Sequence, residues 1–242
     1  GAGGLVPSYP PFAEMVAVVD GQLEKTDLGD SVLRECLRFL HLCLTFNAKS
    51  AGQTPQAYAK AMLDKGEGAL FTFQRLVERA FQSRSSQVVE GAARSLVALV
   101  KWAPEQFALK YSTRREWLKK NLLEGSAGTR ESIGELLDII AAHISLADLS
   151  TLLSELFEQQ IQPKSVPEKL KDLSTDVAAL SGALLGAGIL AAEAMRRSAG
   201  DEAKGGGEGG GGAKLLSGLC SHCALLLSHQ SPSIVAAACK LF

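Results

Sequence analysis

The sequence predicts an all-α protein of the HEAT/armadillo type, an α-solenoid built from antiparallel helix pairs. Apolar residues recur with helical spacing along most of the 242 residues, and no stretch alternates with the period of a β-strand. Aromatic residues make up only 6% of the chain, so the core is mostly Leu, Ala and Val, which favours helix over sheet. Similar helices also recur at regular intervals, as expected of a repeat protein.

Caps and breaks divide the apolar pattern into successive helices. Proline suits a first helical turn, and Ser or Thr suits the position just before it, which sets several of the boundaries. Thr113, Ser145 and Ser231 are predicted caps of this kind. The predicted helices span residues 8–25, 32–44, 54–64, 68–82, 88–102, 104–111, 113–124, 129–144, 146–160, 177–195, 215–227 and 234–242.

The helix from Val177 to Met195 is apolar on all sides, which is typical of a helix buried by its neighbours. Its bulky residues are diluted by Ala and Gly. Each Gly inside a helix costs about 1 kcal/mol relative to Ala, so its presence indicates that a neighbour approaches closely. We therefore expect close helix packing at Gly182, Gly186 and Gly188.

A membrane span is the alternative for this helix. Spanning takes about 20 predominantly apolar residues, whereas the uncharged run of residues 177–192 has sixteen. The run consists largely of Ala, Gly and Ser, which are weakly hydrophobic. We therefore favour a buried helix and expect no membrane span.

Four helices begin alike, with a small or capping residue and a first half rich in Ala or Gly. They read VVEGAARSL from residue 88, TRESIGELL from 129, VAALSGALL from 177 and IVAAACKLF from 234. Their starts lie 41, 48 and 57 residues apart. The last interval holds a Gly-rich insertion, and without its roughly fifteen residues the spacing matches the HEAT/armadillo period of about 40–47. Another helix precedes each of the four, so the sequence predicts four helix pairs.

The predicted organisation follows from these pairs. Residues 1–65 are expected to form N-terminal helices leading into the solenoid, and residues 66–242 about four HEAT-like pairs. Residues 198–213, with GGGEGGGG at their centre, are expected to be a flexible insertion between two helices, because a Gly-rich run has no means of packing. They lack the GxxxxGK[ST] pattern, so they are not expected to form a phosphate loop. The apolar pattern is interrupted at residue 242, so we expect an internal fragment of a longer protein.

The match to the HEAT pattern has one departure. HEAT repeats usually carry Arg just after the first apolar residue of the second helix, and here only Arg130 fills that place. Val89, Ala178 and Val235 occupy the equivalent positions. A regular ladder of polar contacts between repeats is therefore not expected.

The segment from Trp117 to Cys239 contains EWLKKNLLEGSAGTRESIGELLDIIAAHIS, LSGALLGAGILAAEAMRR and HQSPSIVAAACK. In this it resembles the proteasome adaptor and scaffold protein family, which is built from HEAT repeats. The resemblance covers about half of the chain. It implies an elongated, non-catalytic scaffold that contacts the regulatory and core particles of the 26S proteasome and links them to quality control. It implies no catalytic residues and no cofactor.

Two other classes of function stay open. One is a HEAT module of another protein machine, such as a transport receptor, a phosphatase scaffold or a translation regulator. The other is a helical-bundle enzyme, which would need a polar pocket with perturbed titrating groups. The sequence offers no support for such a pocket.

The only metal-like cluster is Cys220-Ser221-His222-Cys223, which His229 and Cys239 would have to complete to four zinc ligands. The CxxC pair sits inside an apolar helical run, and no second pair has finger spacing. We therefore expect no metal site and interpret these cysteines as small buried residues.

The remaining Cys and His residues carry no recognisable motif. Cys36 and Cys43 are seven residues apart on one helical face and are predicted to be core. His41 and His143 lie in no HExxH or nucleophile setting, so a Cys–His hydrolase would depend on partners that the fold brings together. Five cysteines within helices indicate free thiols and a reducing compartment, hence the cytoplasm, with the nucleus as a second location.

Arg114, Arg115, Lys119 and Lys120 form a local basic cluster. They spread around a helix rather than along one stripe, which favours a solvated face. A patch for an acidic protein or for RNA is the alternative. Because the net charge is −1, we expect protein partners and no nucleic acid.

Overall fold

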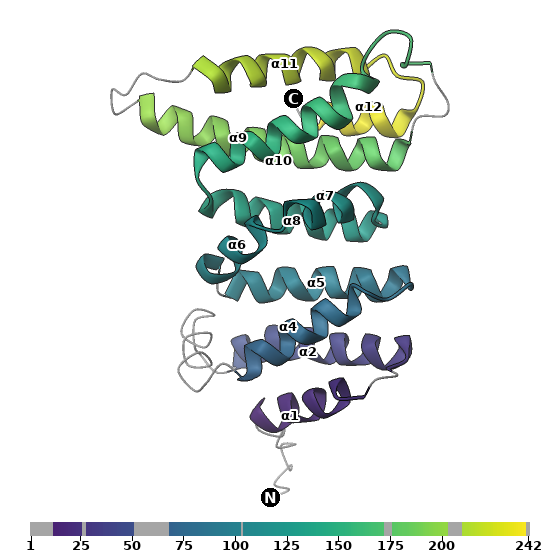
Figure 1. Cartoon of the computed structure of the whole chain (residues 1–242), viewed down its shortest axis with the longest axis vertical. Helices are drawn as coiled ribbons and strands as arrows, with labels where there is room; N and C mark the ends of the chain where they lie inside the picture. The colour runs from purple at the N-terminus through teal and green to yellow at the C-terminus, as the bar shows by residue number, and fades with distance from the viewer. Residues whose placement is uncertain are drawn as a thin grey trace, which may run out of the picture. The chain divides into compact units, whose positions relative to one another are not determined.

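The computed structural model describes residues 12–25, 28–50, 68–102, 104–171, 176–202 and 210–240. Every regular element in these ranges is helical, which confirms the all-α prediction. The α-helices are α1 (Phe12–Leu23), α2 (Asp30–Ser50), α4 (Gly68–Ala80), α5 (Ser86–Trp102), α6 (Pro104–Ser112), α7 (Arg115–Glu124), α8 (Ala127–His143), α9 (Leu146–Leu156), α10 (Val177–Glu202), α11 (Gly210–Leu226) and α12 (Pro232–Cys239) (Figure 1).

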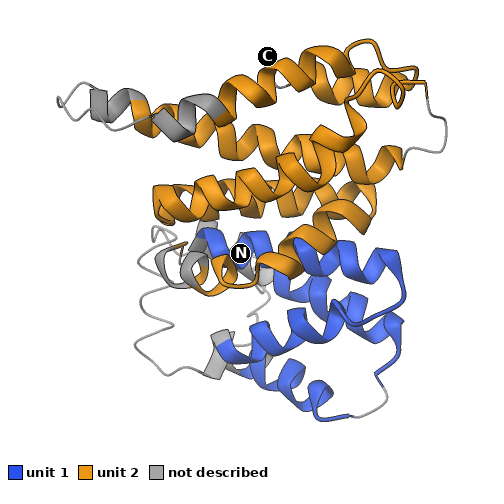
Figure 2. Cartoon of the chain, turned by 45° about the horizontal axis from the view of Figure 1, so that its top comes forward, with its two compact units in different colours: residues 1–102 blue, residues 103–242 orange. Residues whose placement is uncertain are grey.

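The chain divides into two compact units, residues 1–102 and residues 103–242 (Figure 2). We call them unit 1 and unit 2. The predicted domain boundary at residue 65 and the predicted helix over residues 54–64 fall within residues 51–67, which lie outside the described residues. Both stay predictions.

In unit 1, α2 and α5 pack against each other, and α4 packs on both of them. The side chain of Ser83 donates to Asp30 Oδ1 (2.6 Å), and Arg34 Nη1 donates to Gln87 Oε1 (3.3 Å). The contact further along α2, at Arg34, is therefore made with the residue further along towards α5, Gln87. This order shows that α2 and α5 run parallel. The unit's buried core includes Leu33, Leu37, Leu40, Phe73, Leu76, Val77, Leu96, Leu99 and Val100.

The first helix of unit 1 is held to α4 by polar contacts. Arg75 pairs with Asp20 (Nη1–Oδ1, 3.1 Å) and with Glu24 (Nη2–Oε1, 2.9 Å). Thr72 Oγ1 donates to Asp20 Oδ1 over 3.1 Å. This small network adds to the burial of Val16 and Val19 in positioning α1 beside α4.

Unit 2 is organised around α10, which contacts α7, α8, α9 and α12. The prediction of a buried central helix is confirmed by side chains with no exposed surface, namely Leu180, Ala183, Leu184, Ala187 and Leu190. Among the described helices, only Val177–Ser198 is long and apolar enough to cross a membrane, judged by length and composition. Half of its most apolar window is buried inside the protein, and a core helix passes the same test.

Of the three glycines at which the sequence predicts close packing, Gly182 and Gly186 permit such an approach. A Cβ at Gly182 would overlap the backbone carbonyl of Leu122 in α7. A Cβ at Gly186 would lie 2.5 Å from Leu122 Cδ2 and 3.0 Å from Leu156 Cδ1 of α9. The backbones of α7 and α10 therefore meet at a distance that no side chain allows.

The predicted caps meet different outcomes. Ser145 is confirmed as the N-cap of α9, where its hydroxyl accepts from the backbone N–H of Asp148 (3.1 Å). Thr113 as the cap of α7 is wrong, because Arg114 holds that position without a side-chain cap. The hydroxyl of Thr113 instead donates to the Lys110 carbonyl (2.8 Å), which satisfies the end of α6.

The predicted helix over residues 146–160 is interrupted. The α-helix ends at Leu156 and continues as a π-helical turn, η1 (Phe157–Ile161), and a 3₁₀ turn, η2 (Gln162–Lys164). The backbone N–H of Gln162 bonds to the Phe157 carbonyl, which widens the turn and leaves both Phe157 and Ile161 buried. Pro163 has no N–H, so an α-helix cannot continue through it without losing a bond.

The two helices around the predicted Gly-rich insertion extend into it. The last residue of α10 is Glu202, and α11 begins at Gly210. The remaining residues, 203–209, lie outside the described residues.

Candidate binding surfaces

Three second helices of the predicted pairs, α8, α10 and α12, lie in unit 2, whereas unit 1 contains only one, α5, which packs beside α2. In unit 2, Gly134 of α8 faces Leu185 of α10, and Arg197 further along α10 reaches the end of α8, so α8 and α10 run parallel. α12 packs on α10 as well. In unit 1 the equivalent layer is the parallel pair of α2 and α5. Each layer carries one of the two grooves described below.

The groove of unit 2, here called the apolar groove, has a volume of about 500 Å³ and lies over α10 between α8 and α12. Half-buried Leu185, Gly188 and Ile189 line it, together with the small residues Ala192 and Ala236. Exposed or half-buried charged side chains also line it, namely Arg130, Glu131, Asp138 and Lys240. An apolar depression with a charged rim of both signs suits a row of side chains from a partner helix.

Arg130 shows how the HEAT-like position is used here. Its Nη1 donates to the carbonyl of Gly125 over 2.6 Å. That carbonyl lies just past the end of α7, so Arg130 satisfies the turn within its own helix pair. The described hydrogen bond of Arg130 therefore lies within the α7–α8 pair, and the same side chain also lines the apolar groove.

The groove of unit 1, here called the arginine groove, has a volume of about 350 Å³ and lies between α2 and α5. Its lining is basic and small, and consists of Arg34, Leu37, Arg38, His41, Gly91, Arg94 and Ser95. No carboxylate is among these lining residues. The groove is therefore suited to a ligand that carries negative charge.

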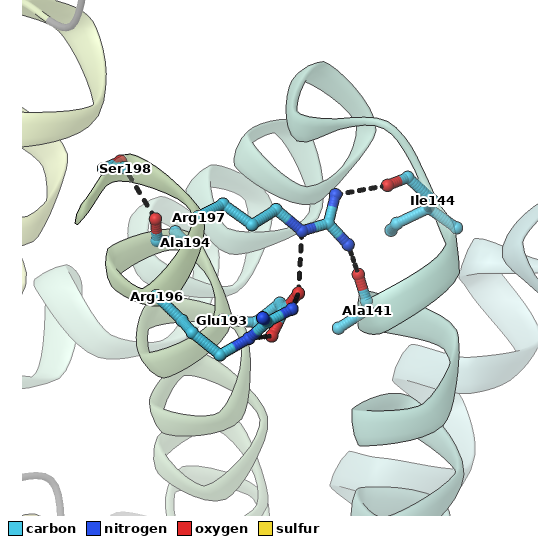
Figure 3. A network of polar contacts seen from close by, with 7 residues as sticks. All are labelled: Ala141, Ile144, Glu193, Ala194, Arg196, Arg197 and Ser198. Atoms are coloured by element: carbon cyan, nitrogen blue, oxygen red, sulfur yellow. Dashed lines mark hydrogen bonds and ion pairs between the residues drawn. The ribbon is translucent and has the colours of Figure 1, made fainter. Parts of the chain in front are cut away.

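A polar network joins α10 to the end of α8 (Figure 3). Glu193 accepts two bonds from Arg196 (2.7 and 2.6 Å) and one from Arg197 Nε (2.7 Å). Arg197 also donates to the carbonyls of Ile144 (2.6 Å) and Ala141. Because the last carbonyls of a helix lack partners within it, Arg197 caps α8 from a neighbouring helix.

The electrostatics of Glu193 follow from this network. Hydrogen bonds from Arg196 favour the charged carboxylate, burial opposes it, and Arg197 adds a further bond, so the pKa of Glu193 falls to about 2. The side chain is only 10% exposed. Glu193 is therefore ionised at neutral pH, and its role is structural support for the α8–α10 contact.

The predicted basic cluster is largely engaged within unit 2. Arg115 pairs with Asp148 (2.6 Å), and the guanidinium of Arg114 lies over the ring of Tyr111, 5.5 Å from its centroid. Lys120 is exposed. The cluster thus does not form one continuous basic patch.

Lys119 is the buried member of the cluster. It forms ion pairs with Glu116 (2.6 Å) and with Glu155 of α9 (2.9 Å). Burial lowers the pKa of Lys119, but the hydrogen bonds and charges of the two carboxylates outweigh it and raise the pKa above its ordinary value. Its role is to join α7 to α9.

The residues of the possible zinc site are not brought together. Among the side chains that the structure describes, no group of three or more Cys, His, Asp or Glu could hold a metal ion.

Cys223 is buried, and this burial, together with the charge of the nearby Cys220, raises the pKa of its thiol to about 11. The prediction of buried cysteines is wrong for Cys220 and Cys239, which are exposed because they face away from the helix contacts. The ring Nδ1 of His229 accepts from the backbone N–H of Ser231 (2.9 Å).

The other candidates also lie apart. Cys36 is half-buried rather than core, and burial and the charge of Glu35 raise its pKa. The side chain of Cys43 lies outside the described residues. His143 is exposed, and His41 lines the arginine groove.

One Ser–His contact was not predicted. Ser165 Oγ lies 2.6 Å from Nδ1 of His222, and the same hydroxyl donates to the Gln162 carbonyl (3.1 Å). A hydroxyl has one hydrogen, so His222 Nδ1–H is the donor to Ser165, the reverse of a nucleophile and its base. Ser165 is fully buried, and the Phe157 ring packs edge-on against His222. The contact ties the segment after η1 to α11, and no sequence signal links residues so far apart.

Comparisons with protein-family models, with curated proteins and with solved structures each returned no match for this chain.

Proposed function

We propose that the chain is a HEAT-type α-solenoid segment of a non-catalytic scaffold that binds proteins through its layers of parallel helices and associates with the 26S proteasome. The proposal extends the all-α architecture to a specific repeat. Such a protein works by holding an extended surface in a defined curvature, and it needs no reaction centre.

The observation that carries the proposal is the parallel course of α8 and α10, with α9 packed on α10 and the apolar groove along the layer. Parallel second helices arise when successive antiparallel pairs stack in register. The recurrence of the same relation between α2 and α5 in unit 1 supports it independently.

The distribution of polar groups supports binding over catalysis. In the apolar groove, the charged side chains of Glu131, Asp138 and Lys240 are exposed, while Leu185, Gly188 and Ile189 are half-buried together with Arg130. Catalysis requires titrating groups that converge on one reacting atom. Protein recognition requires an apolar centre with a polar rim, and the groove has that arrangement.

Association with the proteasome rests on the sequence resemblance of residues 117–239. That segment lies within unit 2 and includes both α8 and α10. A location in the cytoplasm and nucleus follows from the same proposal.

The test is affinity purification of the tagged 242-residue chain from cell lysate with ATP present, followed by identification of co-purifying proteins. We expect regulatory-particle and core-particle subunits. Their absence would contradict the proteasome assignment, and recovery of a transport, phosphatase or translation machine in their place would identify the alternative HEAT function.

A matched pair of variants tests the apolar groove. Ala192→Glu places a charged side chain in the groove, whereas Ala178→Glu makes the same change at an exposed position of α10 outside it. We expect Ala192→Glu alone to reduce the amount of captured partner. Equal capture by both variants would exclude this groove as the binding surface.

A further inference from the structure

We propose that the arginine groove of unit 1 binds an acidic peptide segment of a protein partner, through Arg34, Arg38 and Arg94. The inference rests on the proposed scaffold function and names the chemistry of one of its ligands. It concerns a surface of unit 1, outside the segment that carries the sequence resemblance.

The groove is built from two facing rows. Arg34, Arg38 and His41 follow one another at intervals of four and three residues on α2, which places them on one face of that helix. Arg94 and Ser95 line the opposite wall on α5. The row on α2 and the wall on α5 come from parallel helices, so cationic groups face each other across the groove.

The floor of the groove is open because of a glycine. Gly91 lies on α5 against Leu37, and a Cβ built there would have Leu37 Cδ1 at 3.5 Å as its only neighbour within 4 Å. A larger residue at this position would therefore point into the groove without displacing the backbone. The missing side chain leaves room for a ligand between the arginines.

Arg38 and Arg94 are available to a ligand, while Arg34 uses Nη1 to donate to Gln87 of α5 (3.3 Å) and has further N–H donors on the same guanidinium. Arg38 and Arg94 are 74% and 62% exposed, and their ion pairs are with Glu35 (4.0 Å) and Glu90 (2.5 Å) on their own helices. Exposed ion pairs within a helix contribute less than about 1 kcal/mol. A guanidinium has five N–H donors in a planar fork, so a single glutamate leaves donors for a second carboxylate.

An acidic peptide fits this surface better than a nucleic acid does. Among the described residues that line the groove none is Phe, Tyr or Trp, whereas binding of single-stranded nucleic acids depends on stacking with such rings. Glu35 and Glu90 stand beside the arginines and would repel a continuous row of phosphates. Spaced carboxylates can meet the arginines while avoiding these two glutamates.

The test uses fluorescence anisotropy with the whole 242-residue chain and a fluorescein-labelled peptide, EELAEELAEELA. The comparison peptide is KKLAKKLAKKLA, and a labelled oligouridylate serves as the nucleic-acid probe. We expect binding of the acidic peptide that weakens as salt is added, because charge pairs at exposed sites are screened. The basic peptide is not expected to bind.

Three variants locate the binding. Arg38→Glu and Arg94→Glu should each weaken binding about tenfold, the effect of about 1.4 kcal/mol. Gly91→Gln should weaken it similarly by filling the groove while leaving the charge unchanged. The matched control is Arg84→Glu, the same charge reversal at an exposed position between α4 and α5, which should bind as the unchanged chain does. Circular dichroism verifies that every variant is folded.

The proposal is overturned if the acidic peptide does not bind, if Arg84→Glu weakens binding as much as Arg38→Glu, or if oligouridylate displaces the peptide. Affinity purification with Arg38→Glu separates this proposal from the scaffold function. If the unchanged chain fails to prefer the acidic peptide over the basic one but still captures proteasome subunits, only the groove proposal is overturned. If the acidic peptide binds through the arginines but no proteasome subunits are captured, only the proteasome association is contradicted.

Discussion

Glycines within helices have opposite effects in the two units. In unit 2, Gly182 and Gly186 let α10 approach α7 until the backbones are in contact. In unit 1, Gly91 faces α2 with only one atom near its missing Cβ, and the space becomes part of a groove. A glycine within a helix therefore permits a tight contact between helices in unit 2 and leaves a groove open in unit 1. The sequence alone does not distinguish these two effects.

The charged residues differ in the same way. In unit 2, Arg197 is 21% exposed and satisfies the end of α8 together with Glu193. In unit 1, the arginines of the groove extend into solvent beside glutamates of their own helices. Arg197 thus stabilises a contact between two helices of unit 2, whereas Arg38 and Arg94 of unit 1 pair with glutamates of their own helices and remain available for a partner.

The largest expected effect sharpens the glycine comparison. Gly182→Ala should destabilise unit 2 by about 3 kcal/mol, because the new methyl group meets the Leu122 carbonyl, a backbone atom that cannot turn away. Urea unfolding followed by circular dichroism measures the change. A loss below about 0.5 kcal/mol, the range of ordinary surface substitutions, would show that α7 and α10 do not meet here.

The next effect tests the arginine that caps α8. Arg197→Met should cost about 2 kcal/mol, because the carbonyls of Ala141 and Ile144 lose a charged donor and Glu193 keeps only one of its two partners. The matched control is Arg196→Met, whose side chain is 67% exposed and bonds to Glu193 alone. Equal losses in the two variants would contradict the capping role.

The network also makes stability depend on pH. The pKa of Glu193 is lowered from 4.5 to about 2, so its contribution is fully present above pH 4.5 and is lost as the pH falls towards 2. The expected loss is on the order of 1 kcal/mol, since part of the network is open to solvent. Comparing the chain with Glu193→Gln between pH 5 and about 2 measures it. Parallel pH curves for the two proteins would rule the contribution out.

The smallest effect has the opposite sign. Gly91→Ala should stabilise unit 1 by about 0.5–1 kcal/mol, because Ala is the better helix former and its methyl group makes an ordinary contact with Leu37. Thermal unfolding would show the gain. Destabilisation comparable to that of Gly182→Ala would mean that α2 and α5 pack as tightly as α7 and α10, and the comparison between the units would fail.

The helices themselves were accessible from local patterns. The apolar composition of residues 177–195 predicts a buried helix, and the structure buries Leu180, Leu184 and Leu190 while leaving the face that carries Ala192 open. The Ser145 cap acts over three residues, so the chain segment alone contains the whole interaction. Predictions of this kind succeed because the interacting groups are neighbours in sequence.

The candidate binding surfaces could not be predicted from local sequence patterns. No motif marks His41, Arg34, Arg38 or Arg94 in the sequence, because the groove exists only once α2 and α5 are parallel neighbours. The charges of the basic cluster are evident in the sequence, yet the ion pair of Lys119 with Glu155 of α9 depends on how α7 and α9 pack. Partners from distant segments decide what a charge does.

The amino-acid sequence by itself determined which segments are helical and which helix lies at the centre of unit 2, since period and composition act within a few turns. Tertiary structure decided the rest: the π-helical turn at Phe157–Ile161, the contact of Arg197 with α8, and whether a glycine closes a helix contact or opens a groove. The physical reason is that these features depend on the distance between segments tens of residues apart, which only packing sets.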